Sequence, residues 1–80
     1  MNKQRRSILK SVIERLETAI EKIESVKEDE QEAYDNLPDN LNDTDRATDM
    51  YENVDDMDEA VSGLQDIIDQ LQEIIDRRLK

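Results

Sequence analysis

The chain has 80 residues and carries 22 acidic against 11 basic side chains, which gives a formal net charge of −11. It contains no cysteine and no histidine, so disulfides, thiol nucleophiles, zinc–thiolate sites and the usual general base are excluded. One glycine and one proline leave no glycine-rich phosphate loop and little turn chemistry for a sheet. The composition therefore favours one small helical domain over residues 1–80, with a narrow aliphatic core.

The first segment, residues 3–36, has the apolar periodicity of a long helix. Its main apolar row alternates steps of four and three residues: Leu9, Ile13, Leu16, Ile20 and Ile23. A second row runs beside it at seven-residue spacing: Val12, Ala19, Val26 and Ala33. A helix whose apolar stripe is widened in this way needs more than one partner.

Residues 37–43 are expected to form the turn. Pro38 disfavours helical geometry at Leu37, and the Asn/Asp-rich residues that follow suit turns and helix caps. Asn42, Asp43 and Thr44 are each suited to cap the helix that comes next.

The second segment, residues 44–79, carries a sustained heptad pattern. Its main row is Met50, Val54, Met57, Val61, Leu64, Ile68, Leu71 and Ile75. A second row again lies alongside at seven-residue spacing: Ala60, Ile67 and Ile74. Gly63 interrupts this helix at an outward position, as tolerated drift, as a kink, or as a place where a partner approaches the backbone.

These segments predict an all-α fold, an antiparallel two-helix hairpin with long coiled-coil-like helices. With the turn centred near Asn40, facing positions sum to about 81, so that Ile20 lies level with Val61. The same geometry places Tyr34 and Tyr51 opposite each other near the turn, where they would plug the end of the core. A homodimeric four-helix bundle would cover the second rows, and its expected interface is Val12, Ala19, Val26, Ile67 and Ile74.

Charge is distributed unevenly along the chain. Residues 1–27 have a net charge of +3, residues 28–76 of −17, and residues 77–80 of +3. The second helix carries a row of acids that would repel one another: Asp45, Asp49, Glu52, Asp55, Asp56, Glu59, Asp66 and Asp69. Such a row has two interpretations, a solubilising surface or an array of anions that imitates nucleic-acid phosphates.

The acids near the turn also bear on enzymatic chemistry. Glu28, Asp29 and Glu32, with Glu52 and Asp55, resemble the EExxE…ExxD magnesium signature of MazG-type nucleotide pyrophosphohydrolases, with Asp29 in place of a glutamate. Because 14 of the 32 residues from 28 to 59 are acidic, this spacing arises readily by chance. We therefore expect no enzyme activity, no cofactor and no dedicated metal site.

Other partners are limited by charge and hydropathy. The acidic body opposes direct binding to nucleic acid. No apolar run reaches the roughly 20 residues of a membrane span, and no apolar signal core follows the basic start, so a cytoplasmic location is expected.

The basic opening Met1-Asn2-Lys3-Gln4-Arg5-Arg6, the stretch Glu32-Ala33-Tyr34-Asp35-Asn36-Leu37-Pro38-Asp39-Asn40-Leu41 and the acidic helix ending in Leu64-Gln65-Asp66-Ile67-Ile68-Asp69 carry a resemblance. Together they resemble small acidic proteins of phages and mobile elements of Gram-positive bacteria. Thr44-Asp45-Arg46-Ala47 lacks the glycine that usually follows the turn in that group. The resemblance implies an anti-defence role, such as an anti-CRISPR protein or a DNA mimic.

The sequence thus leads to three hypotheses. The favoured one is a non-enzymatic inhibitor whose acidic helix occupies the basic nucleic-acid-binding groove of a host protein, such as a defence nuclease. The alternatives are a structural coiled-coil assembly module and, more remotely, a magnesium-dependent pyrophosphohydrolase.

Overall fold

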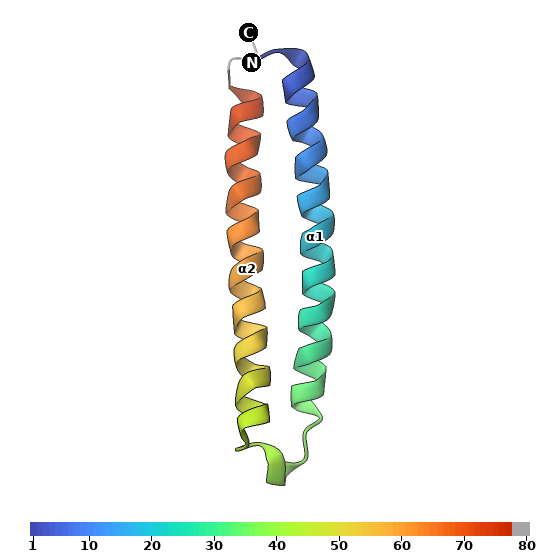
Figure 1. Cartoon of the computed structure of the whole chain (residues 1–80), viewed down its shortest axis with the longest axis vertical. Coiled ribbons are helices and arrows are strands. Elements are labelled where there is room, and N and C mark those ends of the chain that lie inside the picture. Colours follow the sequence, from blue (N-terminus) through green and yellow to red (C-terminus); the bar gives the residue numbers. More distant parts are fainter. Residues whose placement is uncertain (78–80) are drawn as a thin grey trace.

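The computed structural model describes residues 1–77 and shows two long antiparallel helices joined by a short turn (Figure 1). Helix α1 spans Lys3–Asp35, a 3₁₀ turn η1 spans Asp39–Leu41, and helix α2 spans Asp45–Asp76. The hairpin is a rod whose Cα extents are 62 × 15 × 13 Å. The predicted all-α helical hairpin is confirmed. None of the helices in residues 1–77 is long and apolar enough to cross a membrane.

Local capping and a proline fix the limits of α1. The side chain of Asn2 accepts a hydrogen bond from the backbone N–H of Arg5 at 2.8 Å, which satisfies a donor left free at the helix start. At the other end the backbone of Pro38 is extended, with φ −60° and ψ 149°. Because a residue before proline avoids helical geometry, α1 ends at Asp35, one residue before the predicted limit.

The start of α2 is capped by Thr44, one of the three residues suited to that role. Its hydroxyl oxygen accepts from the backbone N–H of Ala47 at 3.3 Å and donates to the carbonyl of Leu41 at 2.7 Å. Helix α2 then runs unbroken through Gly63 to Asp76, where Arg77 turns to extended backbone with ψ 126°. The end predicted near residue 79 lies outside the described residues.

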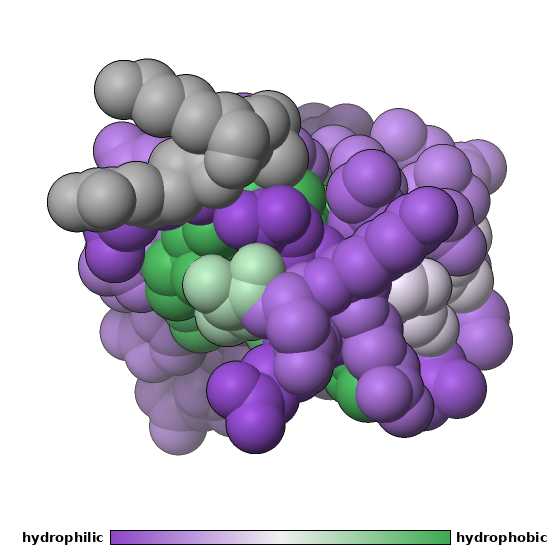
Figure 2. All heavy atoms as spheres, turned by 90° about the horizontal axis from the view of Figure 1, so that it is seen from above, coloured by the Kyte–Doolittle hydropathy of each residue, from purple (hydrophilic) through white to green (hydrophobic). Residues whose placement is uncertain are grey.

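Aliphatic side chains from both helices form the core. Four buried isoleucines make one cluster: Ile13, Ile20, Ile68 and Ile75. The partly buried residues packed against it are Leu9, Leu16, Val61, Leu64 and Leu71. Viewed from the end that holds the N-terminus, hydrophobic residues show at only a few places, and hydrophilic residues cover most of the visible surface (Figure 2). All nine residues belong to the two main rows predicted from the sequence, and burying each isoleucine contributes about 2 kcal/mol.

Contacts between the helices define the register. The ring centroids of Tyr34 and Tyr51 lie 6.0 Å apart, which confirms the predicted pairing. The Nζ of Lys27 donates to a carboxylate oxygen of Asp58 at 3.0 Å. The residue numbers in each of these pairs sum to 85, and those of the hydrogen-bonded pair Asn53–Glu30 sum to 83.

The register therefore differs from the predicted sum of about 81. The chain runs on in extended conformation at Pro38 past the end of α1 before it turns, so α2 begins further along the long axis than α1 ends (Figure 1). With facing positions that sum to about 84, Ile20 lies level with Leu64 rather than with Val61. The apolar rows still face each other, because the shift is close to one heptad step of three or four residues.

Candidate protein-binding surfaces

The eight acids predicted as a binding row lie together on the outward side of α2. In the heptad phase of the core they occupy the three positions furthest from α1, and all eight are exposed. We call this set the acidic face: Asp45, Asp49, Glu52, Asp55, Asp56, Glu59, Asp66 and Asp69. Within residues 1–77 none of them forms an ion pair or a side-chain hydrogen bond. The acidic face is therefore available to a partner along its whole length.

The acidic face is dense from Asp45 to Glu59 and is interrupted by a step of seven residues to Asp66. It covers 24 helical steps, or about 36 Å, which gives roughly one carboxylate per 5 Å of axis. A single DNA strand carries one phosphate per 3.4 Å of axis, so the face is a somewhat sparser line of anions. Repulsion between neighbours costs a few tenths of a kcal/mol per pair and is a disadvantage for the isolated helix.

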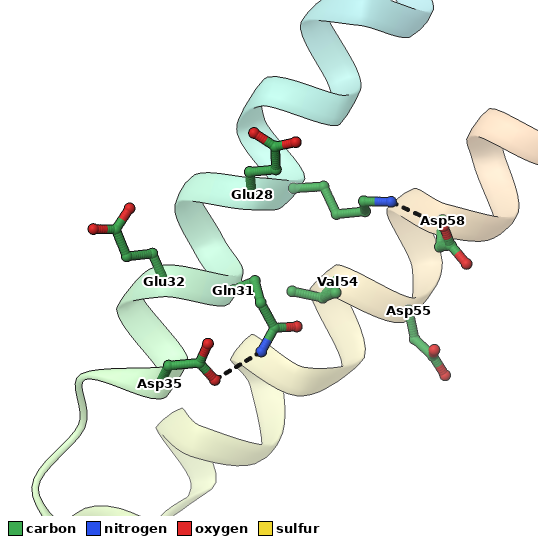
Figure 3. A pocket seen from close by; sticks show the side chains of 8 residues that line it. Glu28, Gln31, Glu32, Asp35, Val54, Asp55 and Asp58 are labelled. Carbon is green, nitrogen blue, oxygen red and sulfur yellow. Dashed lines mark hydrogen bonds and ion pairs between the residues drawn. The ribbon is translucent and has the colours of Figure 1, made fainter.

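Beside the acidic face lies a shallow depression of about 450 Å³ between the helices, close to the turn (Figure 3). Lys27 reaches across it from α1 to Asp58 on α2, and Gln31 donates to Asp35 at 2.9 Å. The carboxylate of Asp58 raises the pKa of Lys27, chiefly through their hydrogen bond. Lys27 therefore stays cationic and neutralises one acid in an otherwise negative depression.

The acids that resemble the MazG-type signature do not converge in this structure. Glu28 and Glu32 lie on the edge of the depression and point away from α2, while Asp55 points away from the opposite helix (Figure 3). Among residues 1–77 no three carboxylates lie close enough together to hold a metal ion. The geometry thus adds nothing in favour of a magnesium site.

A second surface is formed by the second apolar rows of α1 and α2, because the heptad pattern places both rows on the same side of the hairpin. We call this surface the apolar flank: Val12, Ala19, Val26, Ala60, Ile67 and Ile74. Val26 and Ala60 line one hollow between the helices, which shows that the two rows meet. Val26 is 55% exposed and Ile67 is 45% exposed, whereas Val12, Ala19 and Ile74 are half-buried. The five predicted interface residues thus lie on one side of the hairpin.

The tyrosine pair closes the turn end without being buried. Tyr34 is half-buried and Tyr51 is 60% exposed, with an angle of 54° between the rings. The expectation of a core plug therefore holds for Tyr34 only. Tyr51 leaves an aromatic ring accessible beside the acidic end of α2.

Sequence reasoning missed the polar contacts that join the helices near the turn. Lys27 and Glu30 occupy the positions that continue the main apolar row of α1 beyond Ile23, and they bind Asp58 and Asn53 on α2. The signal was present, because the aliphatic rhythm stops at Ile23 while the helix continues to Asp35. If the heptad pattern is continued past Ile23 through the polar residues, it places Lys27 and Glu30 on the side of α1 that faces α2.

Comparison with protein-family models, with curated proteins and with solved structures finds no match to this chain.

Proposed function

We propose that this chain is a non-enzymatic protein-binding inhibitor. Its acidic face occupies a basic nucleic-acid-binding groove on another protein and so competes with the nucleic acid. The observation that carries the proposal is the acidic face itself, eight exposed carboxylates in one line without a partner among the described residues. The resemblance to small phage proteins suggests a host defence nuclease, as in anti-CRISPR inhibition, as the kind of target.

Two physical features support this proposal over a solubilising surface. The carboxylates are held along one side of a single continuous helix, so that they can lie along an extended basic groove. The acids are also more numerous than solubility needs, since a net charge of magnitude about 2–8 suffices for a small domain. The mutual repulsion along α2 is then a cost that binding to a basic groove relieves.

The proposal is tested by competition between this protein and duplex DNA for a purified basic nuclease, titrated from about 50 to 200 mM salt. We expect the affinity of the protein to fall steeply with salt, as multi-phosphate contacts do. Reversing Asp49, Glu52, Asp56 and Glu59 to lysine should abolish competition and leave helicity intact or higher.

A matched control carries the same change in charge on the other helix. Glu14, Glu17, Glu21 and Glu24 of α1 are exposed acids outside the acidic face, and reversing these four should leave competition largely intact. Equal loss from both quadruple variants would show a general charge effect. Retained competition after the α2 reversals, or joint binding of DNA and protein, would contradict the proposal.

The apolar flank favours a second candidate, an assembly role. The flank sets exposed Val26 and Ile67 beside half-buried Val12, Ala19 and Ile74, so that apolar side chains adjoin one another along one side of a narrow hairpin. We infer that the flank joins two hairpins into a homodimeric four-helix bundle. An alternative partner for the same surface is a helix of a larger coiled-coil assembly. The dimer is compatible with inhibition, because the acidic face points away from the core and is not part of the flank.

A further inference from the structure

We propose that a second copy of this chain packs against the apolar flank and runs in the opposite direction. The two copies are related by a two-fold axis that is perpendicular to the long axis of the hairpin and passes beside Gly63 of α2. This inference rests on the proposed homodimer and adds its orientation. In this arrangement α1 packs against α1 of the second copy, and α2 packs against α2. Each turn then lies near the open end of the other hairpin.

Charge complementarity selects this orientation. We divide the hairpin into an open half, residues 1–26 and 58–77, and a turn half, residues 27–57. The described open half carries ten acids and seven bases, and the turn half carries twelve acids and two bases, so their net charges are −3 and −10. Side-by-side association with both turns at one end would bring −10 against −10. The opposite orientation brings −10 against −3 and reduces the repulsion.

The charges on α1 attract one another in this orientation and offset part of the repulsion between the two copies of α2, whose residues 41–57 and 58–77 each carry a net charge of −5. Residues 1–26 carry six bases and four acids, a net +2, whereas residues 27–40 carry six acids and only Lys27, a net −5. In the opposite orientation, residues 1–26 of one copy lie along residues 27–40 of the other, so that stretches of opposite net charge face each other. Arg15 of one copy comes level with Asp29 of the other, at the edge of the apolar flank.

Side-chain sizes along the flank fit the same axis. The six residues of the flank are centred on Ala19 and Ile67, and the proposed axis lies half a heptad nearer the turn, between Ala19 and Val26 on α1 and between Ala60 and Ile67 on α2. Reversal about this axis sets Ile67 against Ala60 of the second copy and Val26 against Ala19, so that large residues meet small ones. Such alternation lets two helical faces interdigitate.

Gly63 lies at the centre of this arrangement, and no other described residue packs against it. A Cβ added to it would meet nothing within 4 Å, and α2 continues through it as regular helix. Glycine in an exposed helix interior costs about 1 kcal/mol relative to alanine. In the heptad phase it borders the apolar flank, where the absence of a side chain lets a second α2 approach closely.

The available area matches what a stable dimer requires. A face of 62 × 15 Å offers roughly 900 Å² per copy when two hairpins overlap fully, and a standard interface buries about 800 Å² per partner. Full overlap is possible with either orientation, so the area supports the dimer and the charges select its direction.

The orientation also deepens the proposed inhibition. With α2 beside α2, both acidic faces lie on the same side of the dimer, about 10 Å apart and running in opposite directions. Two antiparallel rows of anions are what duplex DNA presents with its two phosphate strands. With both turns at one end, the two faces would lie on opposite sides of the bundle.

The test uses the full chain, which has no cysteine of its own. A spin label is attached to Asn40→Cys at the exposed turn, and the distance between the two labels is measured by pulsed electron paramagnetic resonance together with the mass in solution. Each turn lies about 26 Å along the hairpin from the proposed two-fold axis, so we expect a dimer with labels about 50–60 Å apart. A dimer with labels closer than about 25 Å would overturn the orientation and leave the homodimer standing. A monomer at every concentration would overturn both.

A variant pair then tests the position of the axis. Gly63→Gln should raise the dimer dissociation constant about tenfold or more, because a side chain must fit between two closely packed helices. The neighbouring Ser62→Gln places the same side chain on the side away from the flank and should leave dimerisation unchanged. Unchanged dimerisation of Gly63→Gln would overturn the axis at Gly63. None of these readouts depends on a target protein, so failure of the dimer and failure of the inhibition are distinguishable.

Discussion

The open half and the turn half of the hairpin have the same helical geometry but different interiors. Within residues 1–77, four of the five buried hydrophobic residues lie in the open half: Ile13, Ile20, Ile68 and Ile75. The turn half buries only Ala47, and its interior also receives Lys27 and Glu30 from α1. The open half is therefore held by hydrophobic packing, and the turn half by a few polar contacts and caps.

The comparison shows why the acidic end of the molecule is also its weaker end. The turn half carries a net charge of −10 and shallow hollows on both sides of the helix pair, near Lys27 on one side and Val26 on the other. Stability along a hairpin is not uniform, and segments with few buried apolar contacts open first. A partner that neutralises the acids would stabilise the half that the chain itself stabilises least.

The largest expected effect tests the open half. Ile68→Ala should lower the free energy of unfolding by about 2–5 kcal/mol, because it removes a side chain that is 6% exposed from the centre of the isoleucine cluster. Chemical denaturation followed by circular dichroism measures the change. Ile8→Ala is the matched control, since Ile8 is 57% exposed, and it should leave stability unchanged or slightly higher. Equal effects of the two substitutions would contradict this assignment of the core.

A smaller effect of opposite sign is expected in the turn half. Lys27→Leu should raise the free energy of unfolding by about 1 kcal/mol, because an aliphatic side chain at this position would continue the apolar row of α1 opposite the Val54–Met57 stretch of α2. The loss of the ion pair is inexpensive, since the side chain of Asp58 is 69% exposed and stays hydrated. Lys22→Leu, at an exposed position of the same helix, should give no comparable gain. A destabilised Lys27→Leu variant would show that the polar contact matters more than packing.

The helices themselves could be predicted from the sequence because their determinants are local. The apolar rows give the buried side of each helix, Pro38 ends α1, and Thr44 caps α2. The register could not be predicted as well, because it depends on how far the chain runs on past α1 before it turns. That length is a property of the Pro38 backbone and of η1, which residue spacing does not encode.

The positions of the candidate surfaces could be predicted from the sequence, but the partners that they bind could not. Heptad phase alone places Asp49 and Glu52 on the outside of α2 and Ile67 on its flank, and the structure shows all three exposed. A solvated face and a binding face of acids have the same periodicity, so the pattern does not identify the partner. The hydrogen bond between Asn53 and Glu30 does not follow from the apolar rows, because neither side chain is apolar.

The smallest effect concerns the pH dependence of the Lys27–Asp58 pair. The hydrogen bond to Asp58 raises the folded-state pKa of Lys27 above its ordinary value of 10.5. A raised lysine pKa contributes stability that is fully present below about pH 10.5 and is lost as the pH rises through the folded-state pKa. Asp58→Asn should therefore have a slightly lower Tm than the wild type at about pH 8, and the difference should shrink as the pH rises above 10.5. Asp55→Asn, which removes an exposed acid without a described partner, should show no such convergence. A Tm difference for Asp58→Asn that persists at high pH would mean that Asp58 acts through something other than the charged amine of Lys27.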